Sequence, residues 1–193
     1  MKVAIVEYNA GNVASVRNAL RRLGTEPIIT GDFEELMSAD KVIFPGVGEA
    51  SSAMNFLKEK GLDQILPNLK QPVLGICLGQ QLMCNQIEEG NTVGMNIFDV
   101  NVKRFPSSGI IPHMGWNTVF DLESPLFKGV SEIEDVYFVH SYYCEISEYT
   151  IAKCDYILPY SAALQKDNFY ATQFHPEKSS GIGAKIIENF LSL

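Results

Sequence analysis

Residues 73–81 read V-L-G-I-C-L-G-Q-Q, and this stretch decides how the chain can fold. Its first part is a short apolar run typical of a buried strand, and a helix is expected to begin at Leu78. A glycine stands two residues before Cys77 and another two residues after it, which allows a sharp turn between strand and helix. The stretch therefore predicts a strand–turn–helix unit that presents a cysteine at the start of the helix.

The N-terminal half repeats this alternation of apolar runs and helical spacing. Strands are predicted at residues 3–6, 27–30, 42–44 and 73–76, and helices at residues 13–23, 32–39 and 50–60. Such alternation indicates right-handed crossovers and a parallel sheet with helices on both faces. We therefore predict an α/β fold, a three-layer and mostly parallel open sheet flanked by helices.

The second half predicts an antiparallel extension of that sheet. Its strand candidates are residues 98–103, 136–143, 162–166 and 169–174. Asp167-Asn168 looks like a hairpin turn between the last two candidates, and a final helix is expected at residues 182–190. Because the sequence has no internal repeat or linker, we interpret residues 1–193 as a single domain.

Composition narrows the classes of function. Fifteen Lys and Arg against 23 Asp and Glu give a formal net charge of −8, which repels phosphate backbones and argues against nucleic-acid binding. No segment approaches the length of a membrane span. The four cysteines form no C-x-x-C pair and lack metal-type spacing with the three histidines. We expect a cytoplasmic protein with reduced thiols, no membrane contact, no metal and no cofactor.

Cys77 is the candidate nucleophile. At a helix start, free N–H groups and the helix dipole favour the thiolate, and the Leu78 amide can donate to an oxyanion. The alternative is a buried structural cysteine, which is what most single cysteines are. The flanking glycines favour the nucleophile at Cys77, whereas Cys84 is interpreted as core packing, and Cys144 and Cys154 receive no function.

His175-Pro176-Glu177 offers a base and a carboxylate to orient it. Proline favours an extended conformation at the residue before it, and residues i and i+2 of an extended segment share a face. The alternative is a turn at a strand end with a solvated glutamate. His113 and His140 are competing bases, but neither has a carboxylate two residues away, so each is interpreted as a structural or substrate-loop histidine.

A second irregular segment, Pro45-Gly46-Val47-Gly48, follows another predicted strand. Parallel sheets bind ligands beyond the carboxyl ends of their strands. We therefore expect the 45–48 and 75–79 segments to converge on one crevice.

These motifs resemble the class I glutamine amidotransferases, whose nucleophile stands in G-[IV]-C-x-G-x-Q and whose base and orienter are H-P-E. Further motifs make the resemblance more specific: P-G-V-G at 45–48, P-H-M-G-W-N at 112–117, H-S-Y at 140–142 and Q-F-H-P-E-K-S at 173–179. Together they resemble the glutaminase subunits of imidazole glycerol phosphate synthases, from about Lys2 to the C-terminus.

The resemblance implies that Cys77 attacks the glutamine carboxamide, that His175 protonates the departing ammonia, and that Glu177 orients His175. It also implies an oxyanion hole made by the amides of Val47 and Leu78. The residues that it assigns to the glutamine pocket are Gly46, Gly48, Gln81, Glu89, Ser141 and Tyr142, with Glu89 suited to the α-ammonium group.

The resemblance further implies a partner, because ammonia must reach its acceptor along a dry path. In the family the acceptor site belongs to a (β/α)₈-barrel cyclase, which forms a heterodimer with the glutaminase. Asn12, Trp116 and Lys178 are candidates for the docking face, although Trp116 is equally well explained as a partly buried core aromatic. The sequence departs from the family at Glu7–Asn12, where Asn9 replaces a glycine, and at Gln80 and Cys84.

Other functions remain open from the sequence. A very similar protein can supply ammonia to a surface-sugar amidotransferase. From other classes, the chain can be a cysteine hydrolase of other amides, or a catalytically silent binding protein. The intact Cys77, His175 and Glu177 argue against the last of these.

Overall fold

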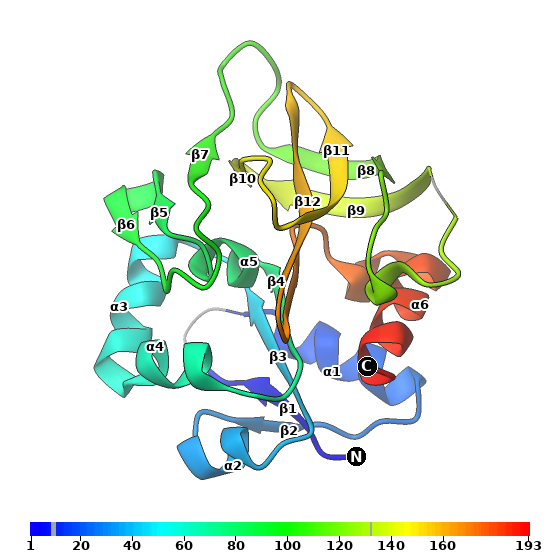
Figure 1. Ribbon diagram of the computed structural model, residues 1–193. Coiled ribbons are helices and arrows are strands. Elements are labelled where there is room, and N and C mark those ends of the chain that lie inside the picture. Colours follow the sequence, from blue (N-terminus) through cyan, green and yellow to red (C-terminus); the bar gives the residue numbers. More distant parts are fainter. Residues whose placement is uncertain (9–10, 132) are drawn as a thin grey trace.

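A computed structural model describes residues 1–8, 11–131 and 133–193 of the chain. A parallel sheet forms its centre (Figure 1), in the strand order β2-β1-β3-β4-β13. These strands are β1 (Val3–Val6), β2 (Ile28–Thr30), β3 (Lys41–Gly46), β4 (Val73–Cys77) and β13 (Phe169–Thr172). Each neighbouring pair is parallel, so the carboxyl ends of β3 and β4 meet at one edge.

Helices cover both faces of this sheet. One face packs against α1 (Val13–Arg22) and α6 (Ser180–Leu191), and the other against α2 (Phe33–Met37), α3 (Ala50–Lys60), α4 (Leu62–Ile65) and α5 (Leu78–Leu82). Alternate strand residues explain the two faces, because Ala4 belongs to the same apolar cluster as Leu57 of α3, while Ile5 belongs to the cluster that contains Leu20 of α1. The predicted three-layer α/β fold is confirmed.

The antiparallel extension is also confirmed. β12 (Pro159–Lys166) pairs with β13, and the sheet continues through β10 (Tyr142–Cys144), β7 (Val102–Arg104), β5 (Gln86–Ile87) and β6 (Thr92–Val93). A branch beyond β12 contains β11 (Thr150–Asp155), β8 (His113–Phe120) and β9 (Glu134–His140). Short 3-10 helices lie at η1 (Leu66–Asn68), η2 (Glu89–Asn91), η3 (Pro125–Phe127) and η4 (Pro176–Lys178).

Several predicted boundaries are wrong for identifiable reasons. β3 runs through Pro45 to Gly46, because its register with β4 extends to the pair Gly46 and Cys77. Residues 98–101 are not a strand, although Phe98 and Val100 are buried. The Phe98 amide donates to the Met83 carbonyl and the Val100 carbonyl accepts from the Asn85 amide, so this segment bonds to the chain just after α5. The candidate 136–143 divides at Ser141 into two strands with different neighbours.

Strands β8 and β11 were not predicted at all. β8 pairs with β9 over a long register, from His113 opposite His140 to Val119 opposite Glu134. Within the described ranges, no helix is long and apolar enough to cross a membrane.

Two glycines of α6 differ sharply in their surroundings. A Cβ on Gly183 would overlap the carbonyl oxygen of Pro176, whereas a Cβ on Gly181 would meet no atom within 4 Å. Gly183 therefore lets α6 pack directly against the backbone between His175 and Glu177.

We predict that Gly183→Ala lowers the free energy of unfolding by at least about 2 kcal/mol, because backbone has to move to admit the methyl group. Gly181→Ala is the matched control, and it is expected to be neutral or to stabilise by up to about 1 kcal/mol. Urea unfolding followed by circular dichroism measures both. Equal stability of the two variants would contradict the close packing of α6 on Pro176.

Candidate active site

Cys77 sits at a strained turn between β4 and α5. Its backbone has φ 55° and ψ −108°, a conformation that a non-glycine residue adopts only when its surroundings enforce it. A Cβ on Gly79 would overlap the carbonyl oxygen of Phe44, so the glycine allows α5 to approach β3. The turn thus presents Cys77 beside Gly46, its register partner on β3.

His175 and Glu177 form a buried pair behind the cysteine. His175 Nδ1 and Glu177 Oε1 are 2.8 Å apart, and each side chain is only 1% exposed. Residues 176–178 form the 3-10 helix η4, so the predicted extended geometry is wrong beyond His175. Proline is favoured at the first position of a helical turn, and this turn brings Glu177 to the ring of His175.

A backbone clamp fixes this pair to β9. The His175 amide donates to the Tyr137 carbonyl at 2.9 Å. Ser179 Oγ accepts from the Tyr137 amide at 3.0 Å and donates to the His175 carbonyl at 2.7 Å. The position of the imidazole therefore depends on the antiparallel extension as well as on the central sheet.

The surroundings of the His175 imidazole favour its protonated form. Burial lowers the pKa of His175, but the nearness of Cys77 and the hydrogen bond with Glu177 outweigh burial and raise the pKa to about 10. His175 Nε2 is buried and has no hydrogen-bond partner among the described residues. This nitrogen is therefore available to exchange a proton with a reacting group.

A cleft of about 310 Å³ opens beside Cys77. Its lining is Val47, Gly48, Cys77, Leu78, Gln81, Glu89, Pro112, Val139, His140, Ser141 and Tyr142. Every residue predicted for the oxyanion hole or the glutamine pocket is in this lining except Gly46. A Cβ on Gly46 would lie 2.6 Å from Tyr8 Oη and 2.8 Å from Gly79 N, so Gly46 packs against Tyr8 and the start of α5 instead of lining the cleft.

Glu89 lies across the cleft in η2. Its Oε2 accepts a hydrogen bond from the Ala50 amide at 2.8 Å. Burial raises the pKa of Glu89, the Ala50 amide opposes that change, and the neighbouring Glu49 adds to it. A half-buried carboxylate of this kind gains from a cationic partner in the cleft.

The other two histidines are unsuited to be the base. Burial lowers the pKa of His113 to about 4 and that of His140 to about 3, so both stay neutral near pH 7. Their rings are joined, with His113 Nδ1 3.1 Å from His140 Nε2. His140 Nδ1 donates to the Tyr142 carbonyl at 2.7 Å. They hold the cleft wall, in line with their interpretation as structural histidines.

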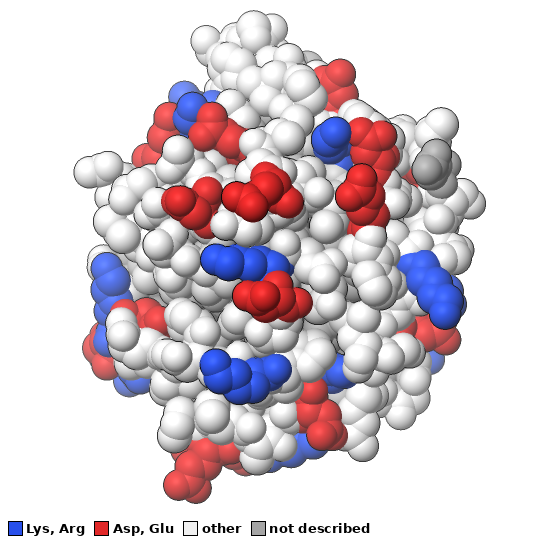
Figure 2. All heavy atoms as spheres, viewed as in Figure 1, with Lys and Arg blue, Asp and Glu red and all other residues white. Residues whose placement is uncertain are grey.

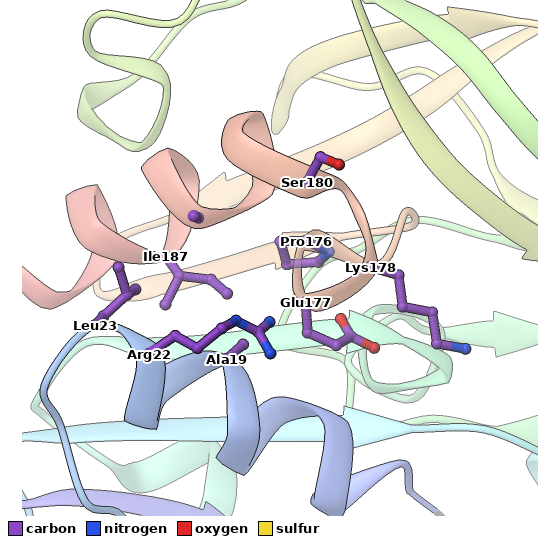
Figure 3. A pocket seen from close by; sticks show the side chains of 9 residues that line it. Ala19, Arg22, Leu23, Pro176, Glu177, Lys178, Ser180 and Ile187 are labelled. Carbon is purple, nitrogen blue, oxygen red and sulfur yellow. The ribbon is translucent and has the colours of Figure 1, made fainter.

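A second cavity lies behind Glu177, between α1, η4 and α6 (Figure 3). It has a volume of about 270 Å³, enough for several water molecules. Arg22 reaches toward Glu177 from α1, while Lys178 points away. Glu177 Oε2 has no hydrogen-bond partner in the part of the chain that the structure describes.

The three candidate interface residues differ in their surroundings. Asn12 caps α1, with Oδ1 accepting from the Ser15 amide at 3.4 Å. Trp116 is 53% exposed, so its interpretation as a partly buried core residue is wrong. Lys178 Nζ lies 5.8 Å from the ring centroid of Tyr137, and Trp116 packs edge-on against the same ring. Asn9 lies outside the described residues.

Two further apolar side chains are exposed on β8 and in the loop before it. Met114 is 63% exposed, and Ile110 in the β7–β8 loop is 81% exposed. Figure 2 shows that the tip of this loop carries no charged side chain, whereas acidic and basic residues intermingle over the remainder of that face. No group of His, Cys, Asp and Glu side chains suited to a metal ion occurs among the described residues.

Sequence reasoning missed three groups around the site. Gln173 Nε2 lies 3.7 Å from Cys77 Sγ, and the Val139 carbonyl oxygen lies 3.8 Å from the same sulfur. Tyr8 Oη donates to the Pro45 carbonyl at 2.8 Å and so supports the 45–48 segment from below. Only Gln173 carried a signal, since it stands in the quoted motif Q-F-H-P-E.

Comparison with known proteins agrees with this geometry. Residues 4–193 match the family model for "Glutamine amidotransferase class-I". A crystal structure of a glutamine amidotransferase is similar with a TM-score of 0.76 and 18% identity, covering 98% of this chain and 97% of that one. The structure of PurLQS from Thermotoga maritima gives a TM-score of 0.73 and 16% identity, covering 99% and 97%. The chain belongs to the class I glutamine amidotransferase family.

Relatives with higher sequence identity show which members of this family the chain resembles. Imidazole glycerol phosphate synthase subunit HisH from Bacteroides fragilis is 61% identical over 196 aligned residues, with both chains covered completely. The protein of that name from Escherichia coli K12 is 43% identical, again with both chains covered completely. Within its family the chain is therefore most similar, among these relatives, to subunits of imidazole glycerol phosphate synthases.

We predict that Glu177→Gln moves the pKa of His175 from about 10 toward its ordinary value, because a carboxylate that holds the proton is lost. His175 has a pKa of about 10 in the folded protein and 6.5 in the unfolded chain. Its protonation therefore stabilises the fold fully below pH 6.5, and this stabilisation is lost as the pH rises toward 10. The free energy of unfolding should therefore decline less steeply between pH 6.5 and 10 in the variant.

Urea unfolding across this pH range and ¹⁵N resonances of the imidazole measure these two effects. Glu188→Gln, which alters an exposed carboxylate of α6, is the control and should follow the wild type. An unchanged His175 titration in Glu177→Gln would contradict the role of the carboxylate.

Proposed function

We infer that the chain is the glutaminase subunit of an imidazole glycerol phosphate synthase, in which Cys77, His175 and Glu177 release ammonia from glutamine. The observation that carries this inference is a cysteine on a strained turn, next to a buried histidine–glutamate pair, at the floor of a cleft. The identity of 61% and 43% to full-length subunits of imidazole glycerol phosphate synthases supports the histidine-pathway assignment over a surface-sugar paralogue.

The first half of the reaction forms a thioester. The Cys77 thiolate attacks the carboxamide carbon of glutamine, and the C=O bond pair moves to oxygen. Amides of Leu78 and Val47 hydrogen-bond the resulting oxyanion, in a cleft that both residues line. His175 then gives a proton to the departing nitrogen as the C–N bond breaks, which releases NH₃ and leaves the glutamyl thioester.

The second half restores the enzyme. His175, now neutral, takes a proton from water, and the hydroxyl oxygen attacks the thioester carbon. The C–S bond breaks, glutamate departs and the Cys77 thiolate re-forms beside the imidazolium. Glu177 accepts a hydrogen bond from His175 Nδ1 throughout, which keeps Nε2 directed at the reacting atoms.

The cleft wall supplies the contacts for the rest of the substrate. Glu89 binds the α-ammonium group, since its half-buried carboxylate lacks a cationic partner within the described residues. Gln81, Ser141, Tyr142 and Gly48 line the remaining walls and contact the α-carboxylate and the side chain. Gly46 acts from beneath, by letting the 45–48 segment lie against Tyr8 and Leu78.

We further propose that residues 1–193 act as one domain and dock onto a (β/α)₈-barrel cyclase as a heterodimer. Ammonia in neutral water is mostly ammonium, which has no lone pair for attack, so delivery along a dry path is required. The exposed Trp116 and Lys178, with the capping Asn12, form our candidate docking surface. The free thiol of Cys77 is suited to the reducing cytoplasm.

We predict that Cys77→Ala lowers glutamine-dependent cyclisation by the reconstituted pair at least about 10³-fold, because the nucleophile is lost. Added ammonium salt should still support cyclisation, since the acceptor site is untouched. Cys84→Ala, which alters a buried thiol outside the cleft, is the control and should retain glutaminase activity. Retained glutaminase activity in Cys77→Ala would exclude the thioester mechanism.

We also predict that Glu89→Gln raises the KM for glutamine about tenfold, because one charge-assisted hydrogen bond is weakened, while kcat changes little. Glu88→Gln is the matched control, since its carboxylate accepts from the Arg104 amide and does not line the cleft. Steady-state glutamate production by the complex measures both constants. A fall in kcat with an unchanged KM would contradict the role of Glu89 in binding glutamine.

A further inference from the structure

We propose that the Gln173 carboxamide donates a hydrogen bond to the Cys77 thiolate and thereby helps to create the nucleophile. Gln173 is fully buried and lies between β13 and η4, two residues before His175. Its Nε2 is 3.7 Å from Cys77 Sγ, a normal distance for an N–H donor to sulfur. The residue therefore contacts a reacting atom directly.

The neighbouring amide fixes which end of Gln173 faces the sulfur. Gln81 Nε2 donates to the Tyr142 carbonyl at 3.0 Å, which identifies it as the nitrogen. The same Nε2 lies 3.0 Å from Gln173 Oε1 and donates its second hydrogen there. Gln173 Nε2 must then point at Cys77 Sγ.

The Tyr142 carbonyl is in turn held by the paired histidines. Asn117 Nδ2 lies 3.2 Å from His113 Nε2 and donates to it. Neutral His113 then carries its proton on Nδ1 and donates to His140 Nε2, and His140 donates from Nδ1 to the Tyr142 carbonyl. A directional series of donors thus fixes this carbonyl, which orients Gln81 and, through Gln81, Gln173.

Burial makes such a donor effective. A hydrogen bond to a charged group strengthens where water is excluded, and Cys77 is only 7% exposed. Among the described residues, the titratable groups that interact with the sulfur include His175 just before η4, Tyr8 from the segment after β1, and Tyr160 from β12. His140, across the cleft, stays neutral. Gln173 adds a donor that carries no charge and therefore acts at every pH.

Gln80 offers a matched comparison within α5. It is equally buried, and its Nε2 donates to a different thiol, Cys144 Sγ, at 3.2 Å. Gln80→Met and Gln173→Met remove the same carboxamide from similar depths, so they separate an effect on Cys77 from a general loss of packing. Gln173→Glu keeps the acceptor for Gln81 and replaces the donor to sulfur with an oxygen.

The test is alkylation of Cys77 by iodoacetamide as a function of pH, with the modified peptide quantified by mass spectrometry. In Gln173→Met we expect the pH of half-maximal alkylation to rise by about one unit, because the thiolate loses one hydrogen bond. Gln173→Glu should shift it further in the same direction. Gln80→Met should follow the wild type.

Turnover by the reconstituted pair gives an independent readout. We expect kcat to fall about tenfold in Gln173→Met with little change in KM for glutamine. Wild-type alkylation profiles in both Gln173 variants would overturn the proposal, and if Gln173→Met does not fold, Gln173→Glu decides alone. The turnover measurement rests on the proposed function, whereas alkylation of Cys77 needs neither glutamine nor a partner. A failure of the proposed function is therefore distinguishable from a failure of the proposed hydrogen bond.

Discussion

The close approach of α5 to the end of β3 is the constraint on which the site depends. Gly79 lies against the Phe44 carbonyl with no room for a Cβ, and this contact sets Gly46 beside Cys77. Val47, Gly48 and the nucleophile then line the same cleft. A wider separation of helix and strand would move the amide of Leu78 away from Val47, and the oxyanion hole that we propose for these two amides could not form.

The two halves of the fold divide the chemistry between them. The parallel sheet provides the strained turn at Cys77, because a strand end followed at once by a helix is a regular product of βα units. The antiparallel extension provides the far wall, the neutral pair His113 and His140, and the backbone clamp on His175. Only β13 belongs to both, since it pairs with β4 on one side and β12 on the other.

Local sequence patterns predicted the parallel layers, the turn at Cys77 and the residues His175 and Glu177. These features depend on neighbours within a few positions, so apolar periodicity and turn residues are sufficient. β8 was missed because its partner β9 begins beyond an intervening loop, and its outward residues Met114 and Trp116 are apolar. Gln173 was not assigned a role because its contacts with Gln81 and Cys77 span 92 and 96 residues.

The hydrogen bonds that run from Asn117 through His113 and His140 to the Tyr142 carbonyl limit which substitutions relatives can accept. Each side chain in this series has one permitted orientation, which the preceding donor sets. A single substitution at either histidine leaves a buried neighbour with the wrong proton arrangement, so isolated changes are disfavoured and compensated pairs are required. These positions should thus be inherited as a unit.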